Sequence, residues 1–128
     1  MVVLTLDPRT GALAAAAAGH PPPRLGGPDG AVTGLEGHGL ALGIDDDQAY
    51  EASFGELAPG ATVVLYTDGV IEARRGGELY GTSRLDALLT ERRTLGAREL
   101  AHAIVADCRA FAGGELSDDC AVVVLKRR

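Results

Sequence analysis

Two acidic positions of this 128-residue chain stand where a folded protein could hold a metal ion or a catalytic base. Asp68 directly follows the apolar run of residues 62–67 and precedes Gly69. Asp118 opens an Asp-Asp pair just before the apolar residues 120–125. Taken singly, each position also fits a plain turn exposed to solvent. Taken together, we expect the two carboxylates to approach each other at one end of two adjacent central strands, where all-oxygen ligation suits Mg²⁺ or Mn²⁺ better than zinc.

Other polar residues carry weaker signals for chemistry. Residues 45–47 are consecutive aspartates, but they lack the glycine and the closing Glu of a calcium-binding loop, so we interpret them as a solvated loop. His20 has no Cys or His at metal-ligand spacing, so we expect a hydrogen-bonded imidazole in a rigid Pro-rich turn. The sequence contains neither a Gly-x-Ser-x-Gly elbow nor a Walker-type phosphate loop.

Charge and composition exclude several classes of function. Twelve Lys and Arg against eighteen Asp and Glu give a net charge of −6, which disfavours nucleic acid and anionic membrane surfaces as partners. The longest apolar run, residues 13–18, is far short of the ~20 residues that cross a bilayer, so we expect no membrane segment. We expect residues 1–128 to form a single domain with its own core.

The two cysteines, Cys108 and Cys120, are too few for a disulfide framework. Both fall within apolar patterns, so we expect both to be buried and reduced. Free thiols are typical of a reducing compartment, and we therefore expect a cytoplasmic protein.

Hydrophobic periodicity and turn residues predict the elements that must position the two carboxylates. We predict a loop at residues 24–30 and strands at residues 2–6, 12–18, 31–36, 48–57, 62–67 and 120–125, the first two forming a hairpin. The last of these strands should be buried. Two helices follow the fifth strand. The first has a capping box at Ser83 and Asp86, and the second has a buried stripe of Leu100, Ile104, Cys108 and Phe111. This order favours an α+β domain, mainly antiparallel sheet, with a helix pair before the last strand.

Five segments, taken in order, resemble one protein family. They are residues 6–11 (Leu-Asp-Pro-Arg-Thr-Gly), 18–23 (Ala-Gly-His-Pro-Pro-Pro), 65–74 (Leu-Tyr-Thr-Asp-Gly-Val-Ile-Glu-Ala-Arg), 109–114 (Arg-Ala-Phe-Ala-Gly-Gly) and 117–124 (Ser-Asp-Asp-Cys-Ala-Val-Val-Val). On these motifs the chain resembles the SpoIIE/RsbU-like branch of the PPM metal-dependent protein serine/threonine phosphatases. The resemblance implies the C-terminal part of a PPM-type αββα sandwich. It also implies a two-metal Mn²⁺ or Mg²⁺ site, in which the residues matching Asp68 and Asp118 are ligands.

The resemblance further implies a hydrolase acting in sigma factor regulation. Family members of this branch remove phosphate from phosphoserine or phosphothreonine, usually on a STAS-type antagonist of an anti-sigma factor. Two metal ions suit this reaction because they activate water near neutral pH and neutralise the charge that builds on the phosphoryl group.

One departure from the family pattern leaves two functions open. The Asp-x-x-Gly-His-Gly motif of the family's first half is missing, although residues 37–39 echo its tail. We therefore expect the chain to begin near the middle of a family domain and to be a very poor phosphatase alone. The alternative is a truncated or degenerate relative that binds a protein and catalyses nothing. We also expect a homodimer, because sheet surface that the absent half would cover tends to be buried by another chain.

Overall fold

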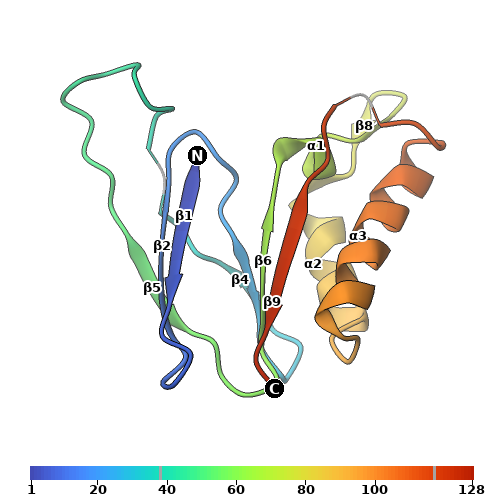
Figure 1. Cartoon of the computed structure of the whole chain (residues 1–128). Coiled ribbons are helices and arrows are strands. Elements are labelled where there is room, and N and C mark those ends of the chain that lie inside the picture. The colour runs from blue at the N-terminus through green and yellow to red at the C-terminus, as the bar shows by residue number, and fades with distance from the viewer. Residues whose placement is uncertain (38, 117) are drawn as a thin grey trace.

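Two antiparallel sheets face each other in the computed structural model, which describes residues 1–37, 39–116 and 118–128 (Figure 1). The first sheet has the order β1-β2-β5 and is formed by β1 (Val2–Leu6), β2 (Ala12–Ala17) and β5 (Ser53–Glu56). The second has the order β4-β3-β6-β9 and is formed by β3 (Arg24–Gly26), β4 (Val32–Gly34), β6 (Thr62–Tyr66) and β9 (Val122–Lys126). His38 and Ser117, which belong to two of the motifs above, lie outside the described residues.

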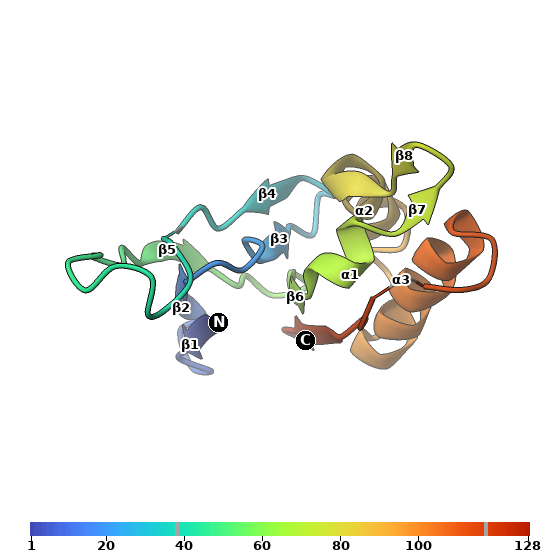
Figure 2. The same cartoon turned by 90° about the horizontal axis from the view of Figure 1, so that it is seen from above.

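Helices cover the outer face of the second sheet, so the layers run sheet, sheet, helix (Figures 1 and 2). The remaining elements are α1 (Asp68–Ile71), the small hairpin of β7 (Arg74–Arg75) and β8 (Glu78–Leu79), α2 (Gly81–Glu91) and α3 (Ala97–Phe111). The predicted α+β class, the antiparallel sheets and the helix pair before the last strand are confirmed. Within the described ranges, no helix is long and apolar enough to span a membrane.

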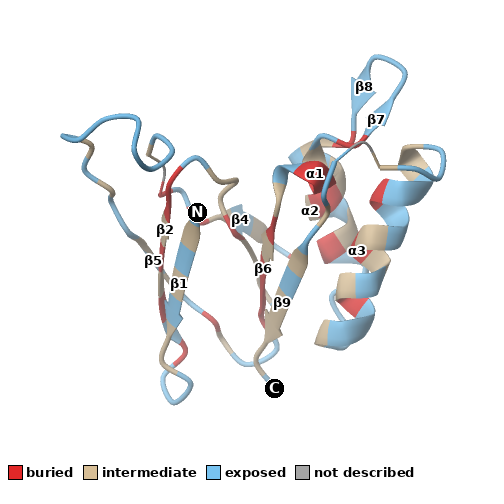
Figure 3. Cartoon of the chain, turned by 45° about the horizontal axis from the view of Figure 1, so that its top comes forward, coloured by how far each residue is buried: buried red, intermediate tan, exposed pale blue. Residues whose placement is uncertain are grey.

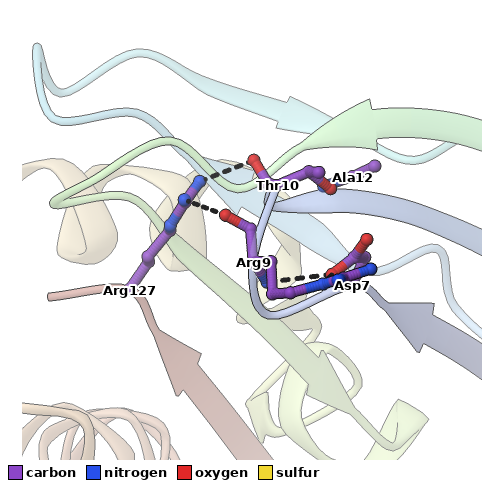
Figure 4. A network of polar contacts seen from close by, with 5 residues as sticks. All are labelled: Asp7, Arg9, Thr10, Ala12 and Arg127. Atoms are coloured by element: carbon purple, nitrogen blue, oxygen red, sulfur yellow. Dashed lines mark hydrogen bonds and ion pairs between the residues drawn. The ribbon is translucent and has the colours of Figure 1, made fainter.

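The turn of the β1–β2 hairpin is hydrogen-bonded to the C-terminal segment of the chain. Its turn closes because the Asp7 carboxylate accepts the backbone N–H of Arg9 at 2.9 Å and Gly11 adopts φ +86°. Arg127, just beyond β9, donates from its guanidinium to the carbonyls of Thr10 at 2.8 Å and Arg9 at 3.0 Å (Figure 4). These bonds hold the two sheets together at the end of the sandwich where the C-terminus lies.

Two apolar cores form on the two faces of the second sheet (Figure 3). Between the sheets lie the buried residues Leu13, Ala15, Leu35, Leu57, Ala61 and Val63. Between the sheet and the helices lie Val64, Tyr66, Val70, Ala73, Tyr80, Leu85, Leu89, Leu100, Ile104 and Cys108. The predicted stripe of the second helix is therefore confirmed for its first three members, while Phe111 is half-buried and packs edge-on against Tyr80 at 5.6 Å between ring centroids.

The outer face of the first sheet carries large apolar side chains without a covering layer in the described structure. Phe54 on β5 is 80% exposed and Val3 on β1 is 49% exposed. Their cross-strand partners on β2 are small, since Phe54 pairs with Ala14 and Val3 pairs with Ala16. This open face therefore presents apolar side chains to solvent.

Two predictions about local structure are wrong. Residues 24–26 form β3 at the centre of the second sheet, where a loop was expected, because Leu25 is paired on both sides, with Thr33 and Val63. The capping box does not form: α2 begins at Gly81 without a side-chain cap. Asp86 instead accepts two hydrogen bonds from the Arg24 guanidinium, at 2.8 and 2.5 Å.

The prediction of a buried last strand is also wrong. β9 is the edge strand of its sheet in the described structure, and Val123 is 55% exposed. An edge strand presents one flank to solvent, which a run of apolar residues does not reveal. Cys120 precedes this strand and is half-buried, whereas Cys108 is fully buried as expected, and both are free thiols. The short helix α1 and the β7–β8 hairpin were not predicted at all.

Candidate metal site

The end of β6 and the start of β9 bring the two predicted acidic sites to one edge of the sheet. The two strands are antiparallel neighbours, and their last register pair joins Tyr66 to Val122. Asp68 lies two residues beyond the end of β6, and Asp118 lies four residues before the start of β9. The expected adjacency of the two strands is confirmed, although β9 is an edge strand and not a central one.

Backbone contacts join the segments that carry the two carboxylates. The Thr67 hydroxyl donates to the Asp119 carbonyl oxygen at 3.0 Å and accepts the Ala121 N–H at 3.0 Å. The Gly69 backbone lies against the peptide that follows Asp119, because a Cβ at Gly69 would be 2.9 Å from the Asp119 carbonyl carbon and would overlap the carbonyl oxygen. The segments therefore meet directly.

Both carboxylates are exposed, and each is oriented by a local hydrogen bond. One oxygen of Asp68 accepts the Gly69 N–H at 3.0 Å, and one oxygen of Asp118 accepts the Asp119 N–H at 2.7 Å. Exposed carboxylate oxygens are the donors that hard divalent cations prefer. Among the residues that the structure describes, no group of three or more His, Cys, Asp or Glu side chains is arranged to hold a metal ion.

An open polar cavity of about 460 Å³ borders the Asp-Asp pair. Its lining includes Arg109, Glu115, Asp118 and Asp119. Arg109 lies in the last turn of α3 and brings a positive charge into a wall that is otherwise acidic.

The other polar candidates behave as the sequence predicted. The His20 ring nitrogen Nδ1 lies 3.0 Å from the Pro21 carbonyl oxygen, a hydrogen-bonded imidazole in the Pro-rich turn. The aspartates of residues 45–47 are exposed, and Asp45 accepts the backbone N–H of Asp47 at 3.0 Å. Neither group lies among the residues of the polar cavity.

The structure also shows supporting groups that the sequence analysis missed. The Tyr80 hydroxyl donates to the Asp107 carboxylate at 2.5 Å, and burial together with this bond raises the pKa of Tyr80. The guanidinium groups of Arg75 and Arg84 lie 4.7 and 4.6 Å from the centre of the Phe111 ring, within cation–π range. These contacts fasten the β7–β8 hairpin and α2 to the end of α3 that borders the cavity. The sequence analysis also assigned no role to Thr67 and Gly69, although both are direct neighbours of Asp68 in the sequence.

Comparisons with known sequences found a family model and a relative that are similar to this chain. The family model of stage II sporulation protein E (SpoIIE) matches residues 1–128. Phosphoserine phosphatase RsbU of Bacillus subtilis (strain 168) is 32% identical over 114 residues, which are 88% of this chain and 34% of RsbU.

Solved structures show the same fold. The SiaA PP2C domain of Pseudomonas aeruginosa superposes with a TM-score of 0.83 at 27% identity, over 99% of this chain and 51% of that one. The manganese-presoaked phosphatase domain of SpoIIE from Bacillus subtilis gives a TM-score of 0.81 at 17% identity, over 99% of this chain and 56% of that one. The chain therefore spans 34% of RsbU and 51% and 56% of these two solved chains.

Proposed function

This chain belongs to the SpoIIE family, and from that premise we propose that it carries part of the metal site of a metal-dependent protein serine/threonine phosphatase. The observation that carries the proposal is the direct contact between the Asp68 and Asp118 segments at one edge of the sheet. Two carboxylates that follow and precede paired strands are held on a rigid frame, which a metal site requires.

The donor set fits Mn²⁺ or Mg²⁺. Asp68 and Asp118 would supply carboxylate oxygens, and their exposure leaves room for water and for ligands from elsewhere in a complete domain. When bound, a pair of such ions supplies activated water and neutralises phosphoryl charge. Of the two proposed ligands, Asp118 lines the cavity, and Arg109 on the cavity wall would attract the phosphate group.

The proposed substrate is phosphoserine or phosphothreonine on a regulatory protein, of the STAS type that controls anti-sigma factors. The support is the family membership, together with RsbU, which is named a phosphoserine phosphatase. An open cavity at the protein surface favours a protein-borne phosphate over a small enclosed ligand. A cytoplasmic location is part of this proposal, since such regulators act beside the transcription machinery.

The alternative is a non-catalytic module that binds a protein partner. It is favoured by one observation: in the described part of the chain, no third His, Cys, Asp or Glu joins the two carboxylates in a metal cluster. Two ions at the usual separation of ~3.5–4 Å need bridging ligands that this pair alone does not provide. We therefore expect residues 1–128 alone to be a very poor phosphatase even in excess Mn²⁺.

A chimaera separates the two readings. Residues 1–128 would replace the matching half of the SiaA PP2C domain, whose other half supplies the rest of a phosphatase fold. The phosphatase proposal expects manganese-dependent hydrolysis of a phosphoserine peptide that Asp68→Asn or Asp118→Asn abolishes. Asp46→Asn, in the exposed acidic loop, is the matched control and should leave the rate unchanged. A folded chimaera without hydrolysis would favour the binding module. Rapid manganese-dependent turnover by residues 1–128 alone would refute the expected dependence on a second half.

We propose that residues 1–128 form a homodimer through the open face of the first sheet. Phe54 and Val3 stand on this face, and burying them removes apolar surface from water. Light scattering after size exclusion should give twice the chain mass, and Phe54→Glu should shift the protein to a monomer. Ile44→Glu is the control, because Ile44 is 66% exposed on a loop outside the sheet. A wild-type monomer at tens of micromolar contradicts the proposal.

A further inference from the structure

The Thr67 side chain links the two acidic segments through two hydrogen bonds of opposite direction. Its hydroxyl donates to the Asp119 carbonyl oxygen and accepts the Ala121 N–H, both at 3.0 Å. Its own backbone N–H donates to the Ala121 carbonyl oxygen, also at 3.0 Å. The regular β6–β9 ladder ends one residue earlier, at Tyr66. Thr67 therefore continues the pairing beyond the strands, up to the acidic segment itself.

Gly69 completes this link from the other side of Asp68. Its φ angle is not in the left-handed region, so the backbone conformation does not demand glycine here. Glycine is required here for a steric reason. A Cβ would lie 2.9 Å from the Asp119 carbonyl carbon and 3.5 Å from the Asp118 carbonyl carbon. The peptide that follows Asp119 thus rests on the Gly69 backbone while the Thr67 hydroxyl holds its carbonyl oxygen there.

We propose that Thr67 is a positioning residue for metal binding: its hydroxyl holds the Asp119 carbonyl group, and with it the preceding Asp118, at the separation from Asp68 that an ion shared by the two carboxylates needs. The inference rests on the proposed function and goes further, because it assigns metal affinity to a residue that does not touch the ion. Asp68 follows Thr67 directly, and Asp118 precedes the residue whose carbonyl Thr67 binds. Like charges repel two neighbouring carboxylates, and the hydroxyl bonds oppose that separation.

The isosteric substitution Thr67→Val tests this role. It keeps the shape of the side chain, removes both hydroxyl bonds and leaves the Asp119 carbonyl and the Ala121 N–H without this partner. Losing a group that orients a metal ligand typically weakens metal binding by about 10–100-fold. Thr67→Ser keeps the hydroxyl and should bind within about 3-fold of wild type, which is small against that range.

Thr90→Val is the matched control for a merely structural role. The Thr90 hydroxyl likewise has two backbone partners, the carbonyl oxygens of Gly30 at 2.8 Å and Asp86 at 3.0 Å, but it lies on α2 and not on the acidic segments. Mn²⁺ binding to the 128-residue chain is measured by the loss of the free-ion signal in electron paramagnetic resonance. Thr90→Val should destabilise the fold about as much as Thr67→Val and leave manganese affinity unchanged.

Two further measurements make the outcomes distinguishable. If Asp68→Asn binds Mn²⁺ as wild type does, the proposed metal site fails, and the positioning role with it. If Asp68→Asn weakens binding but Thr67→Val does not, the metal site stands and the positioning role is overturned. Amide hydrogen exchange at Ala121, measured without metal, should be faster in Thr67→Val than in Thr67→Ser. Equal exchange in the two variants would also overturn the inference.

Discussion

Raising the pH above 9 should destabilise this protein, and Cys108 should account for a defined part of the loss. Burial of the thiol, reinforced by the neighbouring Cys120, raises the pKa of Cys108 from its ordinary value of 9.0 to about 11. The side chain is fully buried, so solvent screening is small. Below pH 9 the thiol keeps its proton in both states, and its contribution to stability is complete. Between pH 9 and 11 the unfolded chain releases the proton and the folded chain does not, so stability falls as pH rises.

The size of this effect follows from the shift. One pH unit across the window changes the free energy of unfolding by about 1.4 kcal/mol for one group, and two units by about 2.7 kcal/mol. That is a large part of the ~5–15 kcal/mol that holds a typical domain together. Tyr80 adds a loss of the same sign above pH 10, because burial and its bond to Asp107 raise the pKa of Tyr80 as well.

Urea unfolding followed by circular dichroism at pH 8, 9, 9.5 and 10 measures the effect. Wild type should lose stability steadily above pH 9. Cys108→Ala should begin less stable at pH 8, because it leaves a small cavity, but should lose about 1 kcal/mol less between pH 9 and 10. Tyr80→Phe serves as the comparison, and its stability should fall about as steeply as that of wild type up to pH 10, because the ordinary pKa of tyrosine is 10.0. Equal slopes for wild type and Cys108→Ala between pH 9 and 10 would refute the reasoning.

Three other predictions follow from burial and pairing. Ile104→Ala should lower the free energy of unfolding by about 3 kcal/mol, whereas Val123→Ala, at a position 55% exposed, should cost under about 1 kcal/mol in the same urea titration; equal costs would contradict the packing. Arg24→Met should cost about 2 kcal/mol, because it leaves the partly buried Asp86 carboxylate unpaired, and an unchanged midpoint would contradict that. A water-soluble thiol reagent should modify half-buried Cys120 before the other cysteine, and simultaneous labelling would show that both are equally accessible.

The sequence was sufficient to predict the elements that are defined by patterns over a few neighbouring residues. Residues 2–6 and 12–17 form the predicted hairpin because alternation and the Pro-Gly turn act over a few residues. The stripe of α3 appears where the helical period placed it, since three of its members are buried on one face. β3 was not predicted, because three residues between prolines and glycines are too few to show a hydrophobic periodicity. These residues form a strand only because they pair with strands on both sides.

For the candidate site, the sequence by itself determined which residues could bind a cation: two carboxylates, each beside an apolar strand, inside motifs that identify the family. Only the tertiary structure decided that those strands are neighbours, that the Thr67 hydroxyl reaches the Asp119 carbonyl 52 residues away, and that Asp86 pairs with Arg24 and not with its own helix terminus. The physical reason is that ligand chemistry belongs to a residue type, whereas a distance between remote segments depends on how strands pair and layers pack, which no local pattern encodes.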